Sequence, residues 1–496
     1  MQSRTRSLAA TLSVAALAVA AAGCGKQEDP ATPAPAYAEQ ISQGISVDAM
    51  VGHLTRLQEI ADQHDGNRAM GTPGYQASVD YVVNTLRDKG FETDTQEFEV
   101  RLPFAEEPDV TVGGAEITAK PLSFTVGTGP DGVSGPLVAA PVDETPGCAD
   151  ADYQGLPVSG AVVLVDRGSC QFGDKQTIAA KRGAVALIVA DNVDRPVEEF
   201  GGTLGSSTDV KIPVVSVSKA EGARLRANPA QAVIKLTAGV NVNKTSNVIA
   251  QTKTGSTENV VMLGGHLDSV PEGPGINDNG SGVAAVLETA LQMGPSPEVE
   301  NAVRFAFWGA EELGLLGSSD YVGRLNAEEL KDIALYLNYD MVGSPNPGYF
   351  TYDGNQSAPP TADGRVPRVP EGSAGIERML VAYLDSAGKP ARDTSFDGRS
   401  DYDAFTAAGI PSGGLFSGAE ENMTAEEAEL WGGKADQPFD PNYHKKTDTL
   451  DQIDHTALEI LGRGVGYSAA LYAQDISGRN GVPVREDRTR HVQSRS

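Results

Sequence analysis

Two residues with metal-binding side chains, His266 and Asp278, stand close together in the sequence. His266 follows the apolar run 260–263, which predicts a buried strand with the histidine at its carboxyl end, where open α/β sheets bind their ligands. Asp278 lies in a Gly/Asn-rich turn before 283–291, whose apolar residues follow the helical period. A strand-end imidazole and a carboxylate in a tight turn can approach a divalent metal ion from one side.

Four more candidate ligands lie further along the chain: Glu311, Glu312, Asp340 and His444. Two histidines combined with carboxylates suit zinc, which accepts both nitrogen and oxygen ligands. Because one catalytic zinc needs only three protein ligands, the surplus predicts two ions about 3.5–4 Å apart that share a carboxylate. The adjacent Glu311 and Glu312 cannot both point the same way on a regular element, so one can bind metal while the other serves as a base.

The segments that must position these residues alternate between strand-like and helix-like patterns. The run 303–308 predicts a strand that leads directly into Glu311, and the run 333–339 predicts another that ends at Asp340. Helical patterns cover 47–61, 74–89, 374–387 and 455–473. The candidate ligands therefore lie at strand ends of an α/β fold or in adjacent turns, except His444, which lies in a loop.

Between about 122 and 240 the texture changes to short β-like runs punctuated by glycine and proline. This stretch contains no histidine and no plausible set of metal ligands, so we expect a small domain inserted into the first. Its sequence VSGAVVLVDRGSCQFGDK (158–175), continued by AAKRGA (179–184), resembles the protease-associated domain, a lid-like module of several peptidase families. The resemblance implies a role in substrate access or binding and none in the chemistry.

Five short motifs contain the candidate ligands: GHLDS (265–269), NDNGSG (277–282), GAEELG (309–314), NYDMVG (338–343), and YH (443–444) followed by TDT (447–449). Together they resemble the co-catalytic zinc aminopeptidases, which include small secreted bacterial enzymes and vacuolar aminopeptidase Y. The resemblance covers about 47–475 and implies an α/β fold with a mixed central sheet flanked by helices, the zinc exopeptidase fold. It also implies a two-zinc hydrolase that removes the amino-terminal residue from peptides with a free amino terminus.

The resemblance also implies a role for each candidate ligand. Glu311 would act as the general base on a metal-bridged water and pass the proton to the leaving amine. Asp268 would orient His266 from behind, and the family's bridging aspartate precedes a cis peptide bond, which here would join Asp278 and Asn279. The implied metal ligands are His266 and Asp340 for one zinc ion, Glu312 and His444 for the other, and Asp278 as the bridge.

A second group of motifs, DGRSD (397–401) and GGLF (413–416), resembles the small secreted enzymes. There an arginine and the tyrosine before the last histidine stabilise the tetrahedral intermediate, which indicates Arg399 and Tyr443. Phe416 matches a wall of the pocket for the terminal side chain, so a large apolar residue such as leucine is the expected preference. The alternatives are that Arg399 only forms a salt bridge and that Phe416 only packs in the core.

One feature departs from those enzymes. They carry a disulfide around the last ligand, and here Asn442 and Thr447 stand in its place, so the loop that carries His444 must be held in another way. Calcium sites occur in some relatives, and the sequence assigns no calcium ligands here.

The amino terminus has the layout of a secretory signal, with a basic start and an apolar run that is too short to span a membrane. The sequence AAGC (21–24) resembles a bacterial lipoprotein box, in which Cys24 would be lipidated, although leucine is most usual at Ala21. This predicts an exported protein on the outer face of the cell membrane, which contacts the membrane only through its lipid anchor. A cut near 20–22 would instead give a secreted protein.

The other two cysteines are Cys148 and Cys170. In an oxidising compartment the simplest prediction is one disulfide, which closes a loop of about 20 residues and stabilises the fold by roughly 3 kcal/mol. The alternative is a pair of unbonded, buried thiols.

The chain of 496 residues has a formal net charge of −28, which repels phosphate backbones and argues against nucleic acid as a partner. A binding protein on a retired peptidase fold is the opposing hypothesis, although all six metal and base positions are present. Among enzymes, carboxypeptidases and glutaminyl cyclases share parts of the fold. The predicted domains are a signal peptide at 1–23, a tether at 24–45, a catalytic domain at 46–121 and 241–475, the protease-associated domain at 122–240, and a disordered tail at 476–496.

Overall fold

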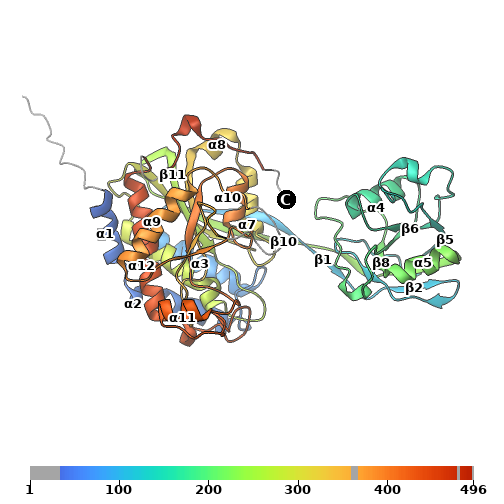
Figure 1. Cartoon of the computed structure of the whole chain (residues 1–496), viewed down its shortest axis with the longest axis horizontal. Helices are drawn as coiled ribbons and strands as arrows, with labels where there is room; N and C mark the ends of the chain where they lie inside the picture. Colours follow the sequence, from blue (N-terminus) through green and yellow to red (C-terminus); the bar gives the residue numbers. More distant parts are fainter. Residues whose placement is uncertain (1–33, 359–366, 478–480, 494–496) are drawn as a thin grey trace, which may run out of the picture.

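The computed structural model describes residues 34–358, 367–477 and 481–493, which form two domains (Figure 1). The large domain contains an eight-stranded mixed sheet with helices on both faces, and the inserted domain contains a second sheet. A two-stranded ribbon joins them, because β1 (Thr93–Ala105) pairs antiparallel with β10 (Ala238–Gln251) along its whole length. The predicted α/β class with an inserted, β-rich domain is therefore confirmed.

The centre of the large sheet consists of parallel strands. In sheet order the strands are β1, β10, β12 (Asn301–Trp308), β11 (Ser256–His266), β13 (Ile333–Tyr339), β16 (Ser412–Phe416), β14 (Phe350–Tyr352) and β15 (Arg392–Thr394). Strands β12, β11, β13 and β16 are parallel neighbours, and antiparallel pairs of β10 with β12 and of β14 with β16 flank them. The carboxyl ends of the central strands therefore meet at one edge of the sheet.

Each face of this sheet has its own apolar core, as expected for strands buried on both sides. In β11, Val261 and Leu263 join one core, whereas Val260 and Met262 join the other. One face is covered by α1 (Ala34–Gly44), α2 (Val47–Gln63), α3 (Pro73–Lys89), α6 (Gly282–Met293), α9 (Ser373–Ser386) and α12 (His455–Gln474). The other is covered by α7 (Leu316–Arg324), α8 (Ala327–Asp332) and α10 (Tyr402–Ala407).

The predicted helices are confirmed to within two residues as α2, α3, α9 and α12. Local capping explains why α2 and α3 begin where they do, since the side chains of Ser46 and Thr72 accept hydrogen bonds from amides of the first turns. Gly90 ends α3 with a left-handed φ of 101°, which suits glycine.

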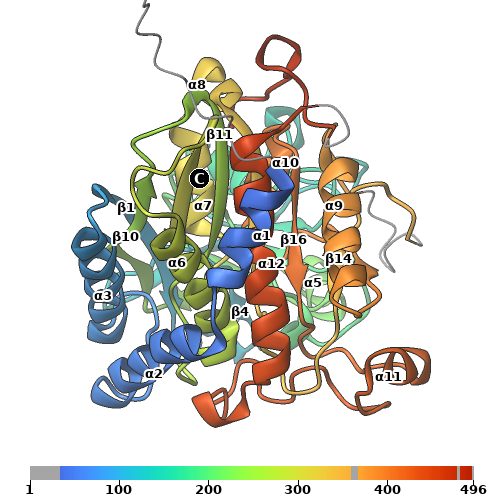
Figure 2. The same cartoon turned by 90° about the vertical axis from the view of Figure 1, so that its left-hand side faces the viewer.

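The prediction of a tether over 24–45 is wrong from residue 34 onwards. Residues 34–44 form α1, which lies beside α12 (Figure 2) and buries Ala38 and Ile41 in the large core, and Ile45 just beyond the helix is buried there as well. The overall composition of this stretch predicted a tether, but Ala38, Ile41 and Ile45 follow the helical spacing and form an apolar face. Cys24 and the predicted signal peptide lie outside the described residues. Among the helices that the structure describes, none has the length and apolarity needed to cross a membrane.

The predicted disordered tail is also wrong for its described part, 481–493. Arg488 is only 2% exposed and donates to the carbonyl oxygens of Glu258 and Lys331. Arg490 donates to the carbonyl oxygens of Gly409 and Ile333. A cluster of arginines suggested a solvated segment, but these guanidinium groups instead satisfy backbone carbonyls at the end of the large domain.

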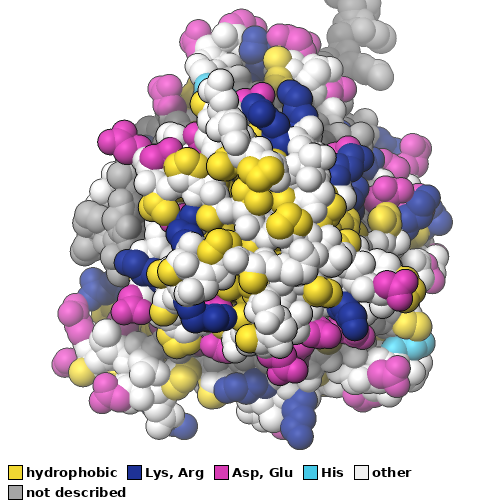
Figure 3. All heavy atoms as spheres, turned by 90° about the vertical axis from the view of Figure 1, so that its right-hand side faces the viewer, with side chains coloured by type: hydrophobic (Ala, Val, Ile, Leu, Met, Phe, Trp, Pro, Cys, Tyr) yellow, Lys and Arg dark blue, Asp and Glu magenta, His cyan; other side chains and the backbone are white. Residues whose placement is uncertain are grey.

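The inserted domain begins earlier than the predicted boundary at 122. Its sheet runs β3 (Ala115–Glu116), β2 (Asp109–Val112), β9 (Gln231–Lys235), β5 (Val133–Ala139), β6 (Val162–Asp166), β7 (Ala186–Ala190), β8 (Val214–Val217) and β4 (Lys120–Pro121). The first strands are too short for a clear sequence signal, whereas β10 continues the ribbon before the predicted end at 240. Helices α4 (Phe172–Lys181) and α5 (Lys219–Ala227) complete the domain. Seen from this end of the molecule, apolar side chains gather in the middle of the face, with charged ones among and around them (Figure 3).

Replacing Arg488 by methionine should destabilise the large domain, because several backbone carbonyls would lose a charged donor. We expect the free energy of unfolding to fall by about 2–4 kcal/mol, measured by urea denaturation followed by tryptophan fluorescence. The matched control is Arg101→Met, which alters an exposed arginine of the ribbon. Equal unfolding midpoints for the two variants would show that the tail does not stabilise the domain.

Candidate active site

The central strands bring four of the predicted site residues to one edge of the large sheet. His266 is the last residue of β11, Glu311 and Glu312 follow β12, and Asp340 follows β13. Because these three strands are parallel neighbours, their carboxyl ends lie side by side. Asp278 reaches the same place from the turn that precedes α6.

Asp278 lies between the two histidines. Its Oδ1 is 3.1 Å from His266 Nε2, and its Oδ2 is 3.2 Å from His444 Nε2. His266 Nε2 also lies 3.3 Å from Asp340 Oδ1, whereas His444 Nε2 lies 3.0 Å from Glu312 Oε2. The structure thus brings together two sets of one histidine and one carboxylate, with the carboxylate of Asp278 shared between them. The peptide bond between Asp278 and Asn279 is cis.

These donor atoms suit two zinc ions. Atoms that each lie about 2.0–2.2 Å from one Zn²⁺ are about 3.3 Å apart, close to the distances seen here. Glu312 Oε1 and Asp340 Oδ1 are buried and have no hydrogen-bond partner among the described residues, as expected of oxygens that face a cation. The combination of imidazole nitrogen and carboxylate oxygen is also that of zinc enzymes.

The carboxylates of the site are packed closely enough to disturb one another's protonation. Burial, together with Asp340, Asp401 and Glu312, raises the pKa of Glu311 well above its usual value, although His266 opposes this shift. Burial and the charge of Asp278 raise the pKa of Glu312 to about 7. So many buried carboxylates are costly to keep ionised unless cations lie among them.

Asp268 lies behind the site, but it acts differently from the expectation. Its carboxylate accepts hydrogen bonds from the backbone amides of Glu311 and Glu312 at 3.1 and 3.3 Å. The closest partner of His266 Nδ1 is the backbone carbonyl of Asp268 at 3.1 Å, and the carboxylate is 3.8 Å away. Asp268 therefore fixes the histidine through its carbonyl and fixes the two glutamates through its side chain.

The loop that carries His444 is held by two buried aspartates that the sequence analysis missed. Asp448 accepts hydrogen bonds from the backbone amides of Asn277 and Asp278 at 2.7 and 3.0 Å. Asp440 accepts one from Asn277 Nδ2 at 2.6 Å. These bonds tie the loop directly to the turn that carries Asp278, which takes the place of the absent disulfide. Asp448 belongs to the TDT motif (447–449), which supported the family resemblance but did not indicate this role.

A second residue that the sequence analysis missed is Arg68, which is fully buried beneath the site. It donates to the backbone carbonyls of Leu267, Pro274 and Gly275, and so joins the segment after His266 to the turn before Asp278. Burial lowers the pKa of Arg68 to about 10, while nearby carboxylates oppose the shift. Arg68 therefore stays charged near neutral pH, and nothing in its local sequence, GNRAM (66–70), distinguishes it.

Arg399 and Tyr443 lie together at the rim of the site. Arg399 donates to Tyr443 Oη at 3.4 Å, and it also pairs with Glu420 and Glu421 at 2.8 and 3.2 Å. Arg399 therefore forms salt bridges, as the alternative prediction proposed, and it also lies beside Tyr443, as the resemblance implied. The Tyr443 ring stacks on the ring of His444, with centroids 3.8 Å apart.

A cavity of about 370 Å³ opens beside these groups. Its apolar wall includes Phe416, Phe350 and Phe439, and the ring of Phe350 lies 6.0 Å from that of Phe416 and 5.2 Å from that of Phe439. Helix α11 (Ala425–Trp431) closes one side. The carboxylates of the site lie in the same cavity, so a ligand in it can touch both the aromatic wall and the proposed metal ligands. Phe416 therefore lines the cavity as well as packing in the fold.

Comparisons with known proteins show which family these features represent. A model of peptidase family M28 matches residues 247–469, and a model of the PA domain matches residues 133–225. The chain is also 63% identical to the probable lipoprotein aminopeptidase LpqL of Mycobacterium tuberculosis, across 99% of each protein. The chain belongs to peptidase family M28. This confirms the family and the inserted domain that the motifs indicated.

Other known proteins are similar to this chain over most of their length. The chain is 39% identical to leucine aminopeptidase 2 of Arthroderma otae, across 89% of this chain and 87% of that one. Among solved structures, the aminopeptidase from Aneurinibacillus sp. strain AM-1 has a TM-score of 0.61 and 27% identity, across 88% of this chain and 96% of that one. The zinc aminopeptidase of Bacillus subtilis has a TM-score of 0.51 and 26% identity, across 88% of this chain and 98% of that one.

Replacing Asp448 by asparagine should loosen the loop, because the new amide group cannot accept hydrogen bonds at both positions. We expect the affinity for zinc to fall by about 10- to 100-fold, measured by competition with a chromogenic chelator. Asp451→Asn, which changes an exposed residue just beyond the loop, is the control. An unchanged affinity in Asp448→Asn would mean that the loop holds its position without this carboxylate.

Proposed function

We propose that this protein is an exported, two-zinc aminopeptidase that hydrolyses the amino-terminal residue from peptides. The observation that carries the proposal is the position of Asp278, whose two carboxylate oxygens face two different histidines. A structural carboxylate has no need of such an arrangement, whereas a pair of metal ions with a shared ligand requires it. The relatives named as aminopeptidases support the same reaction class.

The proposed ligands divide between the two ions. His266 and Asp340 would hold one zinc ion, Glu312 and His444 the other, and Asp278 both. Zinc bound there would lower the pKa of a water molecule and would polarise the peptide carbonyl. The residues around the ions supply the remaining parts of the reaction.

Glu311 is the proposed general base. It lies on the same side of the site as His266, with its Oε2 3.8 Å from His266 Nε2, and is not needed as a ligand in either set. Its side chain lines the same cavity as the proposed metal ligands, which is the position that a general base needs. It takes a proton from the attacking water and passes that proton to the leaving amine.

Arg399 and Tyr443 are the proposed oxyanion stabilisers. The guanidinium and the phenol lie together at the cavity rim, where they can donate to the carbonyl oxygen as negative charge develops on it. Burial and nearby carboxylates raise the pKa of Tyr443, so the phenol keeps its proton and remains a donor. Glu420 and Glu421 restrain the guanidinium through ion pairs.

The aromatic wall supports a preference for a large apolar amino-terminal residue such as leucine. Phe416 and its neighbours offer apolar surface, and the nearby carboxylates can receive the free α-amine of the substrate. The proposed location is the outer face of the cell membrane, with Cys24 as the lipid anchor, a role that the name of the mycobacterial relative supports. Calcium has no proposed site.

The base is tested by Glu311→Gln, which keeps the shape of the side chain and removes its ability to accept the proton. With leucine p-nitroanilide, kcat should fall by about 10²- to 10⁴-fold while the bound zinc is unchanged. Glu429→Gln, which alters an exposed glutamate on α11, serves as the control.

The native enzyme should cleave leucine p-nitroanilide but reject its N-acetylated form, because the proposed reaction requires a free amino terminus. A native enzyme that cleaves both substrates equally would contradict the proposal of an aminopeptidase.

The pocket is tested by Phe416→Ala. Loss of the ring should lower kcat/KM for leucine p-nitroanilide by about 10- to 100-fold, and should lower it much less for alanine p-nitroanilide, whose side chain is too short to use the wall. Phe104→Ala changes a phenylalanine that is 43% exposed on the ribbon, so it should alter neither value. An equal loss for both substrates would show that Phe416 supports the fold and does not select the substrate.

A further inference from the structure

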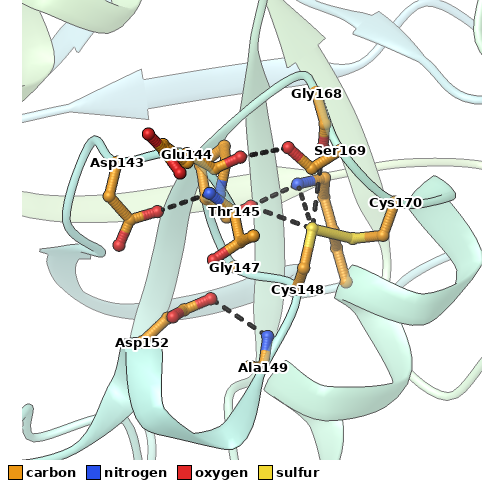
Figure 4. Close-up of a disulfide and its surroundings, with 12 residues drawn as sticks. Asp143, Glu144, Thr145, Gly147, Cys148, Ala149, Asp152, Gly168, Ser169 and Cys170 are labelled. Carbon is orange, nitrogen blue, oxygen red and sulfur yellow. Dashed lines mark hydrogen bonds between the residues drawn. A yellow bond between two sulfur atoms is a disulfide. The ribbon is translucent and has the colours of Figure 1, made fainter.

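The inserted domain contains a buried lysine beside its disulfide. Cys148 and Cys170 are bonded to each other (Figure 4), and Lys175 of α4 has no exposed surface. Lys175 Nζ donates a hydrogen bond to the carbonyl oxygen of Pro146 and another, at 3.3 Å, to Cys148 Sγ. The cation therefore points at one particular sulfur of the disulfide.

This buried cation has no close counter-ion. Among the described residues, no carboxylate lies within 4.0 Å of Lys175 Nζ, and Asp152, Asp166 and Asp143 act on it only from a greater distance. Burial lowers the pKa of Lys175. A buried ammonium group without an ion pair is costly, so an anion formed next to it would be stabilised.

Both cysteines are partly buried, but only one of them lines a surface hollow. Cys170 lines a surface hollow together with Arg167, Ser169 and Phe172, whereas Cys148 does not line it. Ser169 donates to the carbonyl oxygen of Glu144, which holds the two loops of the disulfide together (Figure 4). A reagent in the hollow therefore meets Cys170 first, while the Lys175 cation lies at the opposite sulfur.

We propose that the Cys148–Cys170 disulfide is a thiol-exchange site, at which a small thiol attacks Cys170 and Cys148 leaves as a thiolate paired with Lys175. A sulfur leaves faster when its thiol has a low pKa, and a neighbouring lysine lowers that pKa. Access from the hollow and the position of the ammonium group thus select the same direction of attack.

The electron balance of the exchange is that of a dithiol reductant. The first thiolate forms a bond to Cys170 Sγ, and the electron pair of the broken S–S bond remains on Cys148. The second thiolate of the reductant then attacks its own sulfur in the mixed disulfide, which releases Cys170 as a thiolate and leaves the reductant oxidised. Because Lys175 holds the Cys148 thiolate in place, the reverse reaction with an oxidised dithiol can restore the bond.

The direction of attack can be mapped on the native full-length chain, without any variant. The oxidised protein is treated with glutathione, free thiols are alkylated, and the peptides are identified by mass spectrometry. The expected product carries glutathione on Cys170 and the alkyl group on Cys148. Adducts mainly on Cys148, or equally on both cysteines, would overturn the proposal.

The role of the cation is tested by Lys175→Met, which keeps a similar side-chain length and removes the charge. The rate of disulfide reduction by dithiothreitol should fall by about tenfold. Lys175→Arg should retain most of the native rate, and Lys181→Met, which changes an exposed lysine on the same helix, should not alter it. Native-like reduction of Lys175→Met would overturn the proposal. The near-UV circular dichroism spectrum, compared with that of the native protein, reports whether each variant is folded.

Discussion

The structure of the large domain depends on one requirement, that two histidines far apart in the sequence face the two oxygens of a single carboxylate. His266 is fixed by the end of a central strand, but His444 comes from a loop almost two hundred residues later. Asp278 therefore has to be held from both sides. Arg68 secures its turn to the strand end, and Asp448 secures the same turn to the distant loop. The site is as much a product of these buried polar contacts as of its ligands.

The sequence was informative where function and regular structure coincide. Buried strands such as 260–263 and 333–339 are continuous apolar runs that end at polar residues, so both the strands and the candidate ligands at their ends could be predicted. The local motifs then identified the family and the inserted domain, which the comparisons support. Helices with clear caps, such as α3, were also placed correctly.

Other features could not be predicted, because their signals are not local. Asp448 and Arg68 act by bonding to backbone groups that are remote in the sequence, and no spacing rule connects them. Composition was misleading at both ends of the chain. In α1, the apolar residues pack against α12 and α6, and in the tail, Arg488 donates to carbonyl groups of the large domain. Such contacts depend on the tertiary fold, which composition does not contain.

In the proposed site this chain holds two zinc ions through one shared carboxylate. Elemental analysis of the purified protein and of a His444→Ala variant, after dialysis against zinc and removal of the excess, counts these ions. We expect two zinc ions per native chain and one per variant chain, because His266, Asp278 and Asp340 would still hold the first ion. One ion or none in the native chain, or equal zinc contents in the two proteins, would contradict the proposed site.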